Sequence, residues 1–389
     1  MKIVHICMAQ YSDGWTYQEN LLTKYHVKLG NEVSLITSMF CYREGKLVED
    51  SKTNFYDVNG TRIIRLEKKS NGFMGKLPTY INFYKVLADE EPDIIFSHGC
   101  QYRDVTLVVK YVRAHPNVKL FVDNHADFTN SATSLISKCI LHKLIWRYYA
   151  HRLLPYTERF WGVMPARVDF LIDVYGLPRE KCDLLVMGAD DELVEKSNAD
   201  IKQNRLREKY GIKESNFLIV TGGKIDSAKL QTELLMKAVA EIKNANLKLL
   251  IFGSLEDNIK DRIMRLVDNK RIIYAGWVTP DQSYDYFAIA DLVVFPGRHS
   301  VFWEQADGQG KPMICRSWPG THHIDVGGNV KFIDNDDVES IRSIIQDIYE
   351  NKKLYGDMMQ ACNKAKKEFS YMAIAKKSIG DIDESADGC

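Results

Sequence analysis

The 389-residue sequence lacks the features that mark several large classes of protein. Its eight cysteines form no CxxC pair and no metal-ligand spacing, which argues against a zinc site and favours reduced core thiols over a disulfide framework. No run approaches the ~18 apolar residues of a membrane span, and the apolar stretch at the N-terminus is too short for a signal peptide. These absences predict a chain that is made and kept in the cytoplasm.

Net charge is also missing, because Lys+Arg and Asp+Glu both number 52. A balanced chain gives no general electrostatic attraction for nucleic acid, so we expect no nucleic-acid partner. No GxGxxG fingerprint follows the first strand of either half, which disfavours a dinucleotide-dependent oxidoreductase. Two Asp-x-Asp matches lie in polar C-terminal segments, and we read them as solvated rather than as metal ligands.

What the sequence does contain is a regular alternation of short apolar runs and segments of helical period. Continuous apolar strands separated by helices are typical of parallel sheets covered on both faces. The alternation restarts after a charged stretch at residues 190–214, and a chain of this length favours two cores. We therefore predict an α/β protein with two Rossmann-like, doubly wound domains facing each other across a cleft. Residues 1–195 form the first domain, 196–370 the second, and 371–389 a tail that crosses back toward the first.

The most informative segment runs from Asp291 to Cys315, reading DLVVFPGRHSVFWEQADGQGKPMIC. A strand, a glycine turn and a helix start are followed by one carboxylate, Glu304. Backbone N–H groups at a helix N-terminus bind phosphate, and a carboxylate accepts from ribose hydroxyls. An isolated surface glutamate is the ordinary alternative, but Val301, Phe302 and Trp303 are too apolar for an exposed helix face.

A second candidate element for an anionic ligand lies upstream, in VTGGKIDSAK. Gly222 and Gly223 let the backbone approach a ligand, and Lys224 and Lys229 carry charges that neutralise a diphosphate. A plain turn with two solvated lysines remains the competing interpretation. Trp277, after a later strand, can stack on a base or belong to the core.

In the first half, polar residues follow three strands. Gly14 lies in a polar loop before a helix, and His98 and His125 each follow the end of a strand, with Asp123 and Asp127 beside the latter. Lone histidines are usually structural, but two at matching strand ends are candidates for one site. The basic, aromatic segment 134–156 is either a helix packed on its own domain or a surface that lies on an anionic bilayer.

These motifs, in this order, resemble the retaining nucleotide-sugar glycosyltransferases of the GT-B fold, the "glycosyl transferases group 1" family. The family's GR-x4-K clamp for the donor diphosphate is similar to Gly223-Lys224 with Lys229, where lysine replaces arginine. Its next glycine corresponds to Gly253, and its GxV segment to Gly276-Trp277-Val278. Of its two glutamates, the second corresponds to Glu304, with Gln305 as a rival alignment.

The first glutamate of the family motif has no counterpart here, and His299 or Ser300 stands in its place. Through the resemblance, Gly14 corresponds to the glycine loop of the first domain, Val301 and Phe302 to the backbone at the phosphates. His98, His125 and Asp127 fall on the acceptor side. Donor-binding residues are thus Gly14, Gly222, Gly223, Lys224, Lys229, Gly253, Trp277, Val278, Ser300, Val301, Phe302 and Glu304, and the catalytic candidates are Lys224, Lys229, His125 and His299.

The resemblance implies transfer of a sugar from a nucleotide-sugar, most often a UDP-sugar, to an acceptor hydroxyl, with retained configuration and without a cofactor or divalent metal. It also implies a lipid-linked saccharide acceptor in bacterial capsule, exopolysaccharide or lipopolysaccharide assembly, reached through residues 134–156 on the inner face of the membrane. Three alternatives stay open: a nucleotide-sugar epimerase or phosphorylase on this architecture, an oxidoreductase, and a non-catalytic nucleotide-sugar-binding partner.

Overall fold

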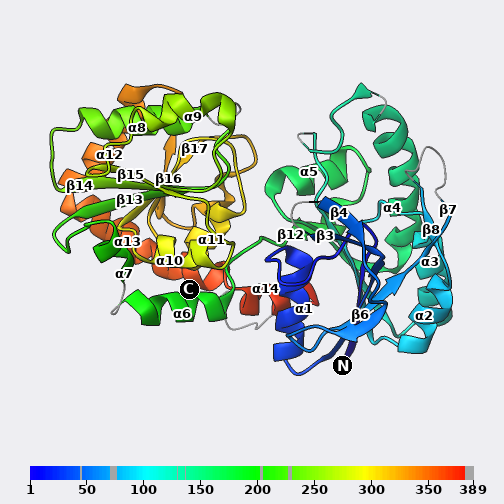
Figure 1. The fold of residues 1–389 in the computed structure, drawn as a ribbon. Helices are drawn as coiled ribbons and strands as arrows, with labels where there is room; N and C mark the ends of the chain where they lie inside the picture. The colour runs from blue at the N-terminus through cyan, green and yellow to red at the C-terminus, as the bar shows by residue number, and fades with distance from the viewer. Residues whose placement is uncertain are drawn as a thin grey trace. The chain divides into compact units, whose positions relative to one another are not determined.

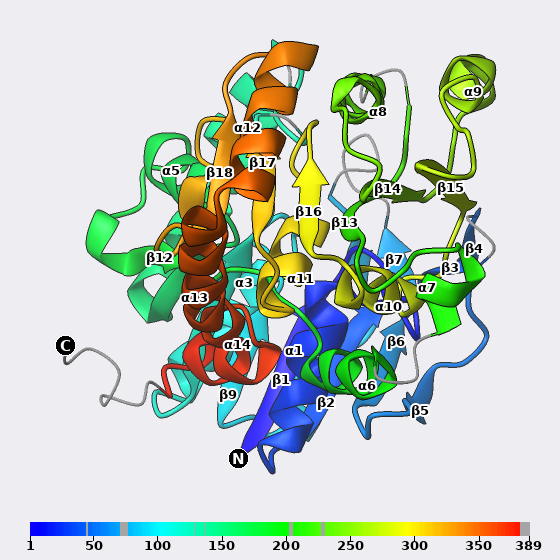
Figure 2. The same ribbon diagram turned by 90° about the vertical axis from the view of Figure 1, so that its left-hand side faces the viewer.

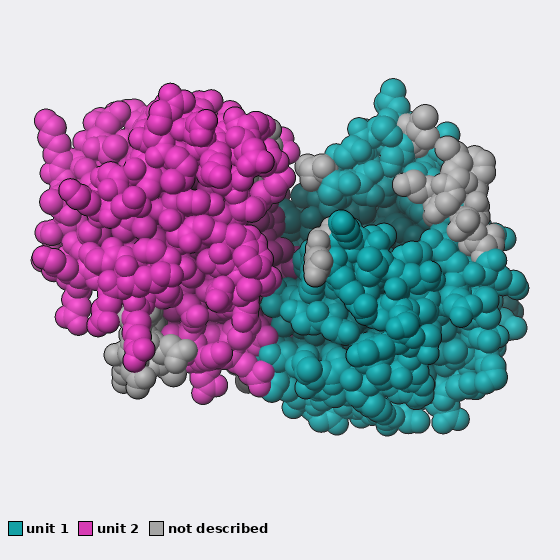
Figure 3. All heavy atoms as spheres, in the orientation of Figure 1, with its two compact units in different colours: residues 1–186, 374–389 teal, residues 187–373 magenta. Residues whose placement is uncertain are grey.

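The computed structural model of the chain describes residues 1–43, 46–70, 77–128, 130–135, 137–201, 205–226 and 230–381. These residues form two compact units, coloured separately in Figure 3. Unit 1 comprises residues 1–186 and the C-terminal segment from Ile374, and unit 2 comprises Met187–Ala373. Each unit is an α/β structure with its own parallel sheet and its own apolar core. This is the predicted fold class.

Unit 1 is built on an eight-stranded sheet in the order β12-β11-β10-β9-β1-β2-β6-β5. All neighbouring strands are parallel except the edge pair β5 and β6. The central strands β1, β2, β9 and β10 are buried along nearly their whole length because both faces of a parallel sheet are covered. Their bounds are β1 Lys2–Cys7, β2 Glu32–Ser38, β5 Asn54–Tyr56, β6 Arg62–Leu66, β9 Ile94–Ser97, β10 Lys119–Asn124, β11 Thr157–Gly162 and β12 Cys182–Leu184.

Helices of unit 1 connect these strands, and two small hairpins extend from the sheet (Figure 1). The helices are α1 Gln18–Lys28, α2 Phe83–Glu90, α3 Val105–Ala114, a π-helix at Ser137–Trp146, α4 Arg147–Leu153, α5 Pro165–Asp173 and short 3₁₀ turns at Leu154–Tyr156 and Arg179–Lys181. The hairpins pair β3 Phe40–Arg43 with β4 Lys46–Glu49, and β7 Lys68–Ser70 with β8 Thr79–Tyr80.

Unit 2 has six parallel strands in the order β15-β14-β13-β16-β17-β18. Counted from the first strand of the unit this is 3-2-1-4-5-6, the order of a dinucleotide-binding sheet. Each strand is a short apolar run: β13 Phe217–Gly222, β14 Leu247–Phe252, β15 Ile272–Gly276, β16 Leu292–Phe295, β17 Met313–Arg316 and β18 Val330–Ile333. The order reverses between β13 and β16, and a ligand site is expected where it does.

Helices cover both faces of the unit 2 sheet, with α8, α9 and α12 on one side and α10, α11 and α13 on the other (Figures 1 and 2). Their amphipathic faces supply Leu235, Val239 and Ile345 to the core. The bounds are α6 Asp191–Ile201, α7 Arg205–Lys209, α8 Gln231–Glu241, α9 Asp257–Met264, α10 Gln282–Ala288, α11 Phe302–Gly308, a 3₁₀ turn His322–Ile324, α12 Val338–Glu350 and α13 Lys352–Glu368.

The division between the units lies at residues 186 and 187, earlier than the boundary at 195 expected from the charged stretch. The residues between those points belong to unit 2 because Asp190 N donates to the Tyr284 hydroxyl of α10 (2.9 Å) and α6 packs against that helix. The chain leaves unit 2 within α14, Tyr371–Ser378, whose residues from Ile374 onward belong to unit 1.

Candidate active site

A pocket lies in unit 2 at the point where the strand order reverses. Its walls come from the ends of β13 and β16 and from the turns that follow them, and they include Gly222 and Lys224 on the first side and Gly297, Arg298 and Ser300 on the second. Loops that leave neighbouring strands in opposite directions open a crevice at the carboxyl edge of the sheet. The two sequence motifs chosen as ligand elements therefore meet at one pocket.

Close backbone approach shapes the floor beside this pocket. Gly253 follows β14 with a φ of +123°, and its N–H donates to the Gly276 carbonyl (2.8 Å). A Cβ at Gly253 would lie 1.9 Å from the Gly223 carbonyl oxygen, and one at Gly222 would lie 2.1 Å from the Phe252 ring. The turns after β13, β14 and β15 can stack this tightly only because glycine lacks a side chain.

Lys224 is held by two carboxylates of its own unit. Its Nζ lies 2.8 Å from Glu256 Oε1 and 3.4 Å from Asp226 Oδ2. The hydrogen bonds that Lys224 donates to Glu256 and Asp226, together with the charges of these carboxylates, raise the pKa of Lys224. The ammonium group is thus a permanent cation whose carboxylate partners an anionic ligand would replace. Lys229, its predicted companion, lies outside the described residues.

Arg298 is a lining residue that sequence reasoning missed. Its exposed side chain borders the pocket, and no ion pair to it occurs within the described ranges. The available signal was its position, one residue past the Pro296-Gly297 turn at the carboxyl end of a strand. Arginine presents a planar fork of donors that matches phosphate oxygens, which lysine does not. Arg298 therefore brings a guanidinium group to this pocket, whereas the family's clamp position holds Lys224 instead of arginine.

Glu304 is completely buried and is bound by two histidines rather than exposed to the pocket. Its Oε1 lies 2.7 Å from His299 Nε2 and 3.1 Å from His323 Nε2. Burial alone would raise the pKa of Glu304, but the two histidines outweigh it and hold the pKa well below its ordinary value. The structure thus places the predicted ribose ligand in a buried hydrogen-bonded cluster, in which His299 belongs to the turn that borders the pocket.

Gln305, the rival for the same alignment, points elsewhere on α11. Its Nε2 donates to the Ser283 hydroxyl of α10 at 2.9 Å. Adjacent helical residues lie about 100° apart around the axis, so only one of the two can face the turn after β16. That residue is Glu304, and Gln305 serves the contact between the two helices.

The remaining donor-side predictions fall around the same edge. Trp277 is 68% exposed just after β15, which removes the alternative that it belongs to the core. Val278 follows it and is half-buried. Ser300 lines the pocket, and Val301 caps the N-terminus of α11 with 41% of its surface exposed. Phe302 packs on Phe252 and Phe287 rather than facing solvent.

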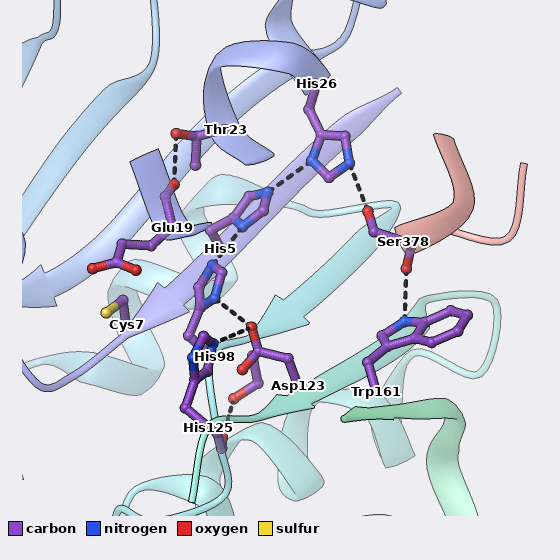
Figure 4. Close-up of polar contacts among 12 residues, drawn as sticks. His5, Cys7, Glu19, Thr23, His26, His98, Asp123, His125, Trp161 and Ser378 are labelled. Atoms are coloured by element: carbon purple, nitrogen blue, oxygen red, sulfur yellow. Dashed lines mark hydrogen bonds and ion pairs between the residues drawn. The ribbon is translucent and has the colours of Figure 1, made fainter. Parts of the chain in front are cut away.

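In unit 1, a second cluster forms at the carboxyl ends of β9 and β10 (Figure 4). Asp123 Oδ2 lies 2.8 Å from His98 Nδ1 and 3.4 Å from His125 Nε2. Burial would raise the pKa of Asp123, yet both histidines lower it well below the ordinary value. The structure thus brings His98 and His125 together on one carboxylate, as matching strand ends predicted.

Asp127 and Gly14 occupy loops of the same unit. Asp127 Oδ2 accepts from Arg167 Nε at 3.1 Å, and Asp127 Oδ1 accepts from the Asn130 backbone N–H, so this carboxylate shapes its own turn. Gly14 has a φ of +73° in the exposed loop before α1. None of these features makes Asp127 or Gly14 part of the histidine cluster.

Each unit therefore holds one carboxylate with two histidines, the composition of a cation site. These are the groups of that composition in the described part of the chain: His98, Asp123 and His125, and His299, Glu304 and His323. The contacts between histidine and carboxylate in both clusters have hydrogen-bond distances, whereas the buried atoms Asp123 Oδ1, Glu304 Oε2 and His323 Nδ1 have no hydrogen-bond partner among the described residues. We assign no metal to either.

Comparison with known proteins agrees with this geometry. Residues 202–368 match the family model "Glycosyl transferases group 1". Mannosylfructose-phosphate synthase of Agrobacterium fabrum is 23% identical over 251 residues, which are 60% of this chain and 55% of that protein. The chain thus spans about half the length of the curated relative that it matches.

Solved structures share the architecture across the whole chain. HepE of Anabaena, in complex with UDP and glucose, has a TM-score of 0.61 at 15% identity, covering 97% of this chain and 98% of that one. UDP-GlcNAc 2-epimerase from Neisseria meningitidis, bound to UDP-GlcNAc, has a TM-score of 0.59 at 13% identity, covering 97% and 98%. The chain has the GT-B fold, and its residues 202–368 are similar to the glycosyl transferases group 1 family.

Proposed function

We propose that this protein is a glycosyltransferase that moves a sugar from a nucleotide-sugar to an acceptor hydroxyl. The pocket where the strand order of unit 2 reverses carries the proposal, because it joins a glycine turn, Lys224 and Arg298 at the carboxyl edge of the sheet. Backbone N–H groups and two cations at such an edge suit a nucleoside diphosphate. A UDP-sugar is the donor we favour, since HepE of Anabaena was solved with UDP and glucose.

In this mechanism the protein supplies position and charge. Arg298, Lys224 and Lys229 stabilise the diphosphate as the bond to the sugar breaks, and Trp277 and Val278 border the base. Glu304 holds His299 beside Ser300 at the turn, where the family's first glutamate is missing. We propose front-face attack by the acceptor hydroxyl with retained configuration, and a diphosphate that leaves without a divalent metal.

The acceptor would be a lipid-linked saccharide of bacterial surface polysaccharide assembly, with His125 of unit 1 on the acceptor side and Asp127 shaping the loop. A non-catalytic nucleotide-sugar-binding role is an outcome of the test below. So is epimerase activity, which the structural similarity to UDP-GlcNAc 2-epimerase favours as a second candidate.

Thermal-shift screening of the full chain against UDP-, GDP- and ADP-sugars tests the donor, because a ligand specific for the native state raises apparent stability. Product analysis then separates the candidates. A glycosylated acceptor supports transfer, an isomerised nucleotide-sugar indicates an epimerase, and binding with neither product indicates a binding partner. No shift with any nucleotide-sugar would refute the proposal.

Replacing Arg298 by alanine is expected to weaken binding of the nucleoside diphosphate about 10–100-fold, since a hydrogen bond to a charged group contributes about 1.5–3 kcal/mol. Titration calorimetry with UDP measures the change. Arg265→Ala is the matched control, because that exposed arginine follows α9 and does not line the pocket. Equal UDP affinity in wild type and Arg298→Ala would contradict the assignment.

A membrane surface is the approach we propose for the acceptor. None of the helices within the described ranges has the length and apolar character needed to cross a bilayer. Just before and along the π-helix and α4, however, the large side chains Leu135, Ile140, Leu144 and Tyr148 are 81%, 45%, 64% and 55% exposed. Exposed Lys143, Arg147 and Arg152 accompany them, which is the composition of a helix lying on an anionic bilayer.

Vesicle sedimentation tests this surface. The double variant Leu135→Ser, Leu144→Ser is expected to lose about tenfold or more in binding to anionic vesicles, since each buried leucine contributes about 1.5–3 kcal/mol. Val58→Ser is the matched control, because Val58 is 94% exposed on unit 1 away from this segment. Wild-type protein that fails to bind anionic vesicles at low salt would overturn the membrane proposal.

A further inference from the structure

Three buried histidines of unit 1 form one hydrogen-bonded chain (Figure 4). His26 Nδ1 lies 2.9 Å from His5 Nε2, and His5 Nδ1 lies 3.0 Å from His98 Nε2. The rings belong to α1, to β1 and to the turn after β9, and all three side chains are buried. Because each ring has both nitrogens engaged, the proton position on one ring dictates the next.

The two outer histidines of this row, His26 and His98, each face a hydrogen-bond acceptor. His26 Nε2 lies 3.0 Å from the Ala375 carbonyl oxygen in α14, and His98 Nδ1 lies 2.8 Å from Asp123 Oδ2. The Ser378 hydroxyl is also 3.0 Å from His26 Nε2, but it donates its own proton to the Ala375 carbonyl at 2.8 Å. His26 must therefore present an N–H to α14.

Counting protons gives the total charge of the three histidine rings. Three rings between two acceptors make four links, and each link needs one proton, whereas three neutral imidazoles carry three. With the protons placed on Nε2 of His26 and His5, the ring of His98 must carry one on each nitrogen. We propose that the three hydrogen-bonded histidines form a proton-ordered relay, anchored on the Ala375 carbonyl, that holds His98 as an imidazolium paired with Asp123.

The electrostatics of the three rings agree with this placement. Burial lowers the pKa of His26 to about 4 and lowers that of His5 further below its ordinary value, so neither ring carries the charge. Burial also acts on His98, but there Asp123 outweighs it and the pKa is raised. Titratable groups facing the His98–Asp123 pair come from β1, α1, the turn after β9 and the residue after β10: His5, Cys7, Glu19, His26, Cys100 and His125.

The relay changes the proposed role of His98 as an acceptor-side residue of unit 1. Both of its nitrogens are occupied, so His98 is a positioning residue rather than a group that contacts an acceptor. Asp123 Oδ2 then accepts from both neighbours, which places the second proton of the cluster on His125 Nε2 and leaves the Nδ1 lone pair of His125, whose side chain is 41% exposed, as the accessible base. This role in catalysis rests on the proposed transfer function, whereas the proton order does not.

NMR of the imidazole nitrogens in the uniformly ¹⁵N-labelled full chain at pH 8 tests the proton order directly. Single histidine variants assign each signal to its residue. We expect His26 and His5 as neutral rings protonated at Nε2, and His98 with both nitrogens protonated. The reverse order, with three neutral rings protonated at Nδ1, would overturn the proposal. In that order the Ser378 hydroxyl would have to donate to His26.

Three variants sharpen the result. His26→Phe leaves two rings that two protons satisfy, so the imidazolium signals of His98 should disappear at pH 8. Ser378→Ala should leave them unchanged, because Ala375 and not Ser378 is the anchor. His142→Phe is the matched control, since His142 is another buried histidine of unit 1, bonded to the Tyr175 hydroxyl outside the chain. Persistence of the signals in His26→Phe, or their loss in Ser378→Ala, would contradict the relay.

If a transfer assay is established, His26→Phe should lower kcat about tenfold and change its pH profile while leaving donor KM unchanged. That fall is smaller than the about 10²-fold or more that a general base itself contributes. A wild-type chain with the expected proton order but no transfer would refute the proposed function and leave the relay standing. Wild-type activity and pH profile in His26→Phe would instead show that the relay does not serve the site.

Discussion

Replacing Gly253 by alanine is expected to lower the free energy of unfolding by about 3 kcal/mol or more and to abolish nucleotide binding. The new Cβ would lie 1.9 Å from the Gly223 carbonyl oxygen, a contact that no side-chain movement can relieve. Overpacking costs about 1–3 kcal/mol, and a left-handed alanine adds about 1–2 kcal/mol. Relief requires the turn after β13 to move, and that turn carries Lys224.

Chemical denaturation and UDP titration of the same sample measure the two effects. Gly356→Ala is the matched control, because that glycine lies within α13, where a Cβ meets nothing within 4 Å. There the substitution should stabilise the helix by about 0.5–1 kcal/mol. Wild-type stability together with wild-type UDP affinity in Gly253→Ala would show that the turns after β13 and β14 do not have the stacked geometry described.

The donor-side turn could be predicted from sequence because its signals are local. Apolar runs such as Leu247–Phe252 and Leu292–Phe295 coincide with strands of the structure. Each is followed by a glycine turn that can be predicted from the neighbouring residues alone. β11 ends at Gly162, where a Cβ would lie 2.4 Å from the Val168 backbone nitrogen of α5, so only glycine allows this close packing. Local hydrophobicity does not register that packing limit.

The histidine clusters could be predicted only in part. His98 and His125 follow neighbouring strands, so the parallel sheet brings them together. His26, in contrast, meets the Ala375 carbonyl across 349 positions of sequence, and His323 reaches Glu304 from the 3₁₀ turn after β17. No hydrophobic periodicity and no motif spacing links the two residues of such a pair in the sequence. Tertiary structure alone identifies them, and it shows that the expected ribose ligand Glu304 is buried and hydrogen-bonded to two histidines.

Replacing Glu304 by glutamine is expected to lower the free energy of unfolding at pH 7 by about 2–4 kcal/mol, because the isosteric amide removes the charge that His299 and His323 surround. The pKa of Glu304 in the fold lies below its ordinary 4.5. Its charge therefore stabilises the fold above pH ~4.5, and this contribution is lost as the pH falls through the folded pKa. The variant should accordingly show a weaker loss of stability in acid.

Asp307→Asn provides the matched control, one turn further along α11. Asp307 is also fully buried, and its Oδ1 accepts from Asn329 Nδ2 at 2.8 Å. Burial, with the nearby charge of Glu304, raises the pKa of Asp307 well above its ordinary value. A raised carboxyl pKa has the opposite sign: stability is present below the ordinary pKa and is lost as the pH rises toward the folded one. Asp307→Asn should therefore leave stability at pH 7 unchanged or increased.

Urea unfolding of the wild type and both variants between pH 3 and pH 8 distinguishes the two carboxyls. The expected result is a Glu304→Gln curve that converges on wild type as the pH falls, and an Asp307→Asn curve that diverges above it as the pH rises. Equal stability of Glu304→Gln and wild type at pH 7 would mean that the carboxylate is not charged between its two histidines. The acid of the family motif would then be free to face a ligand, and its pairing with His299 would not be what replaces the missing glutamate.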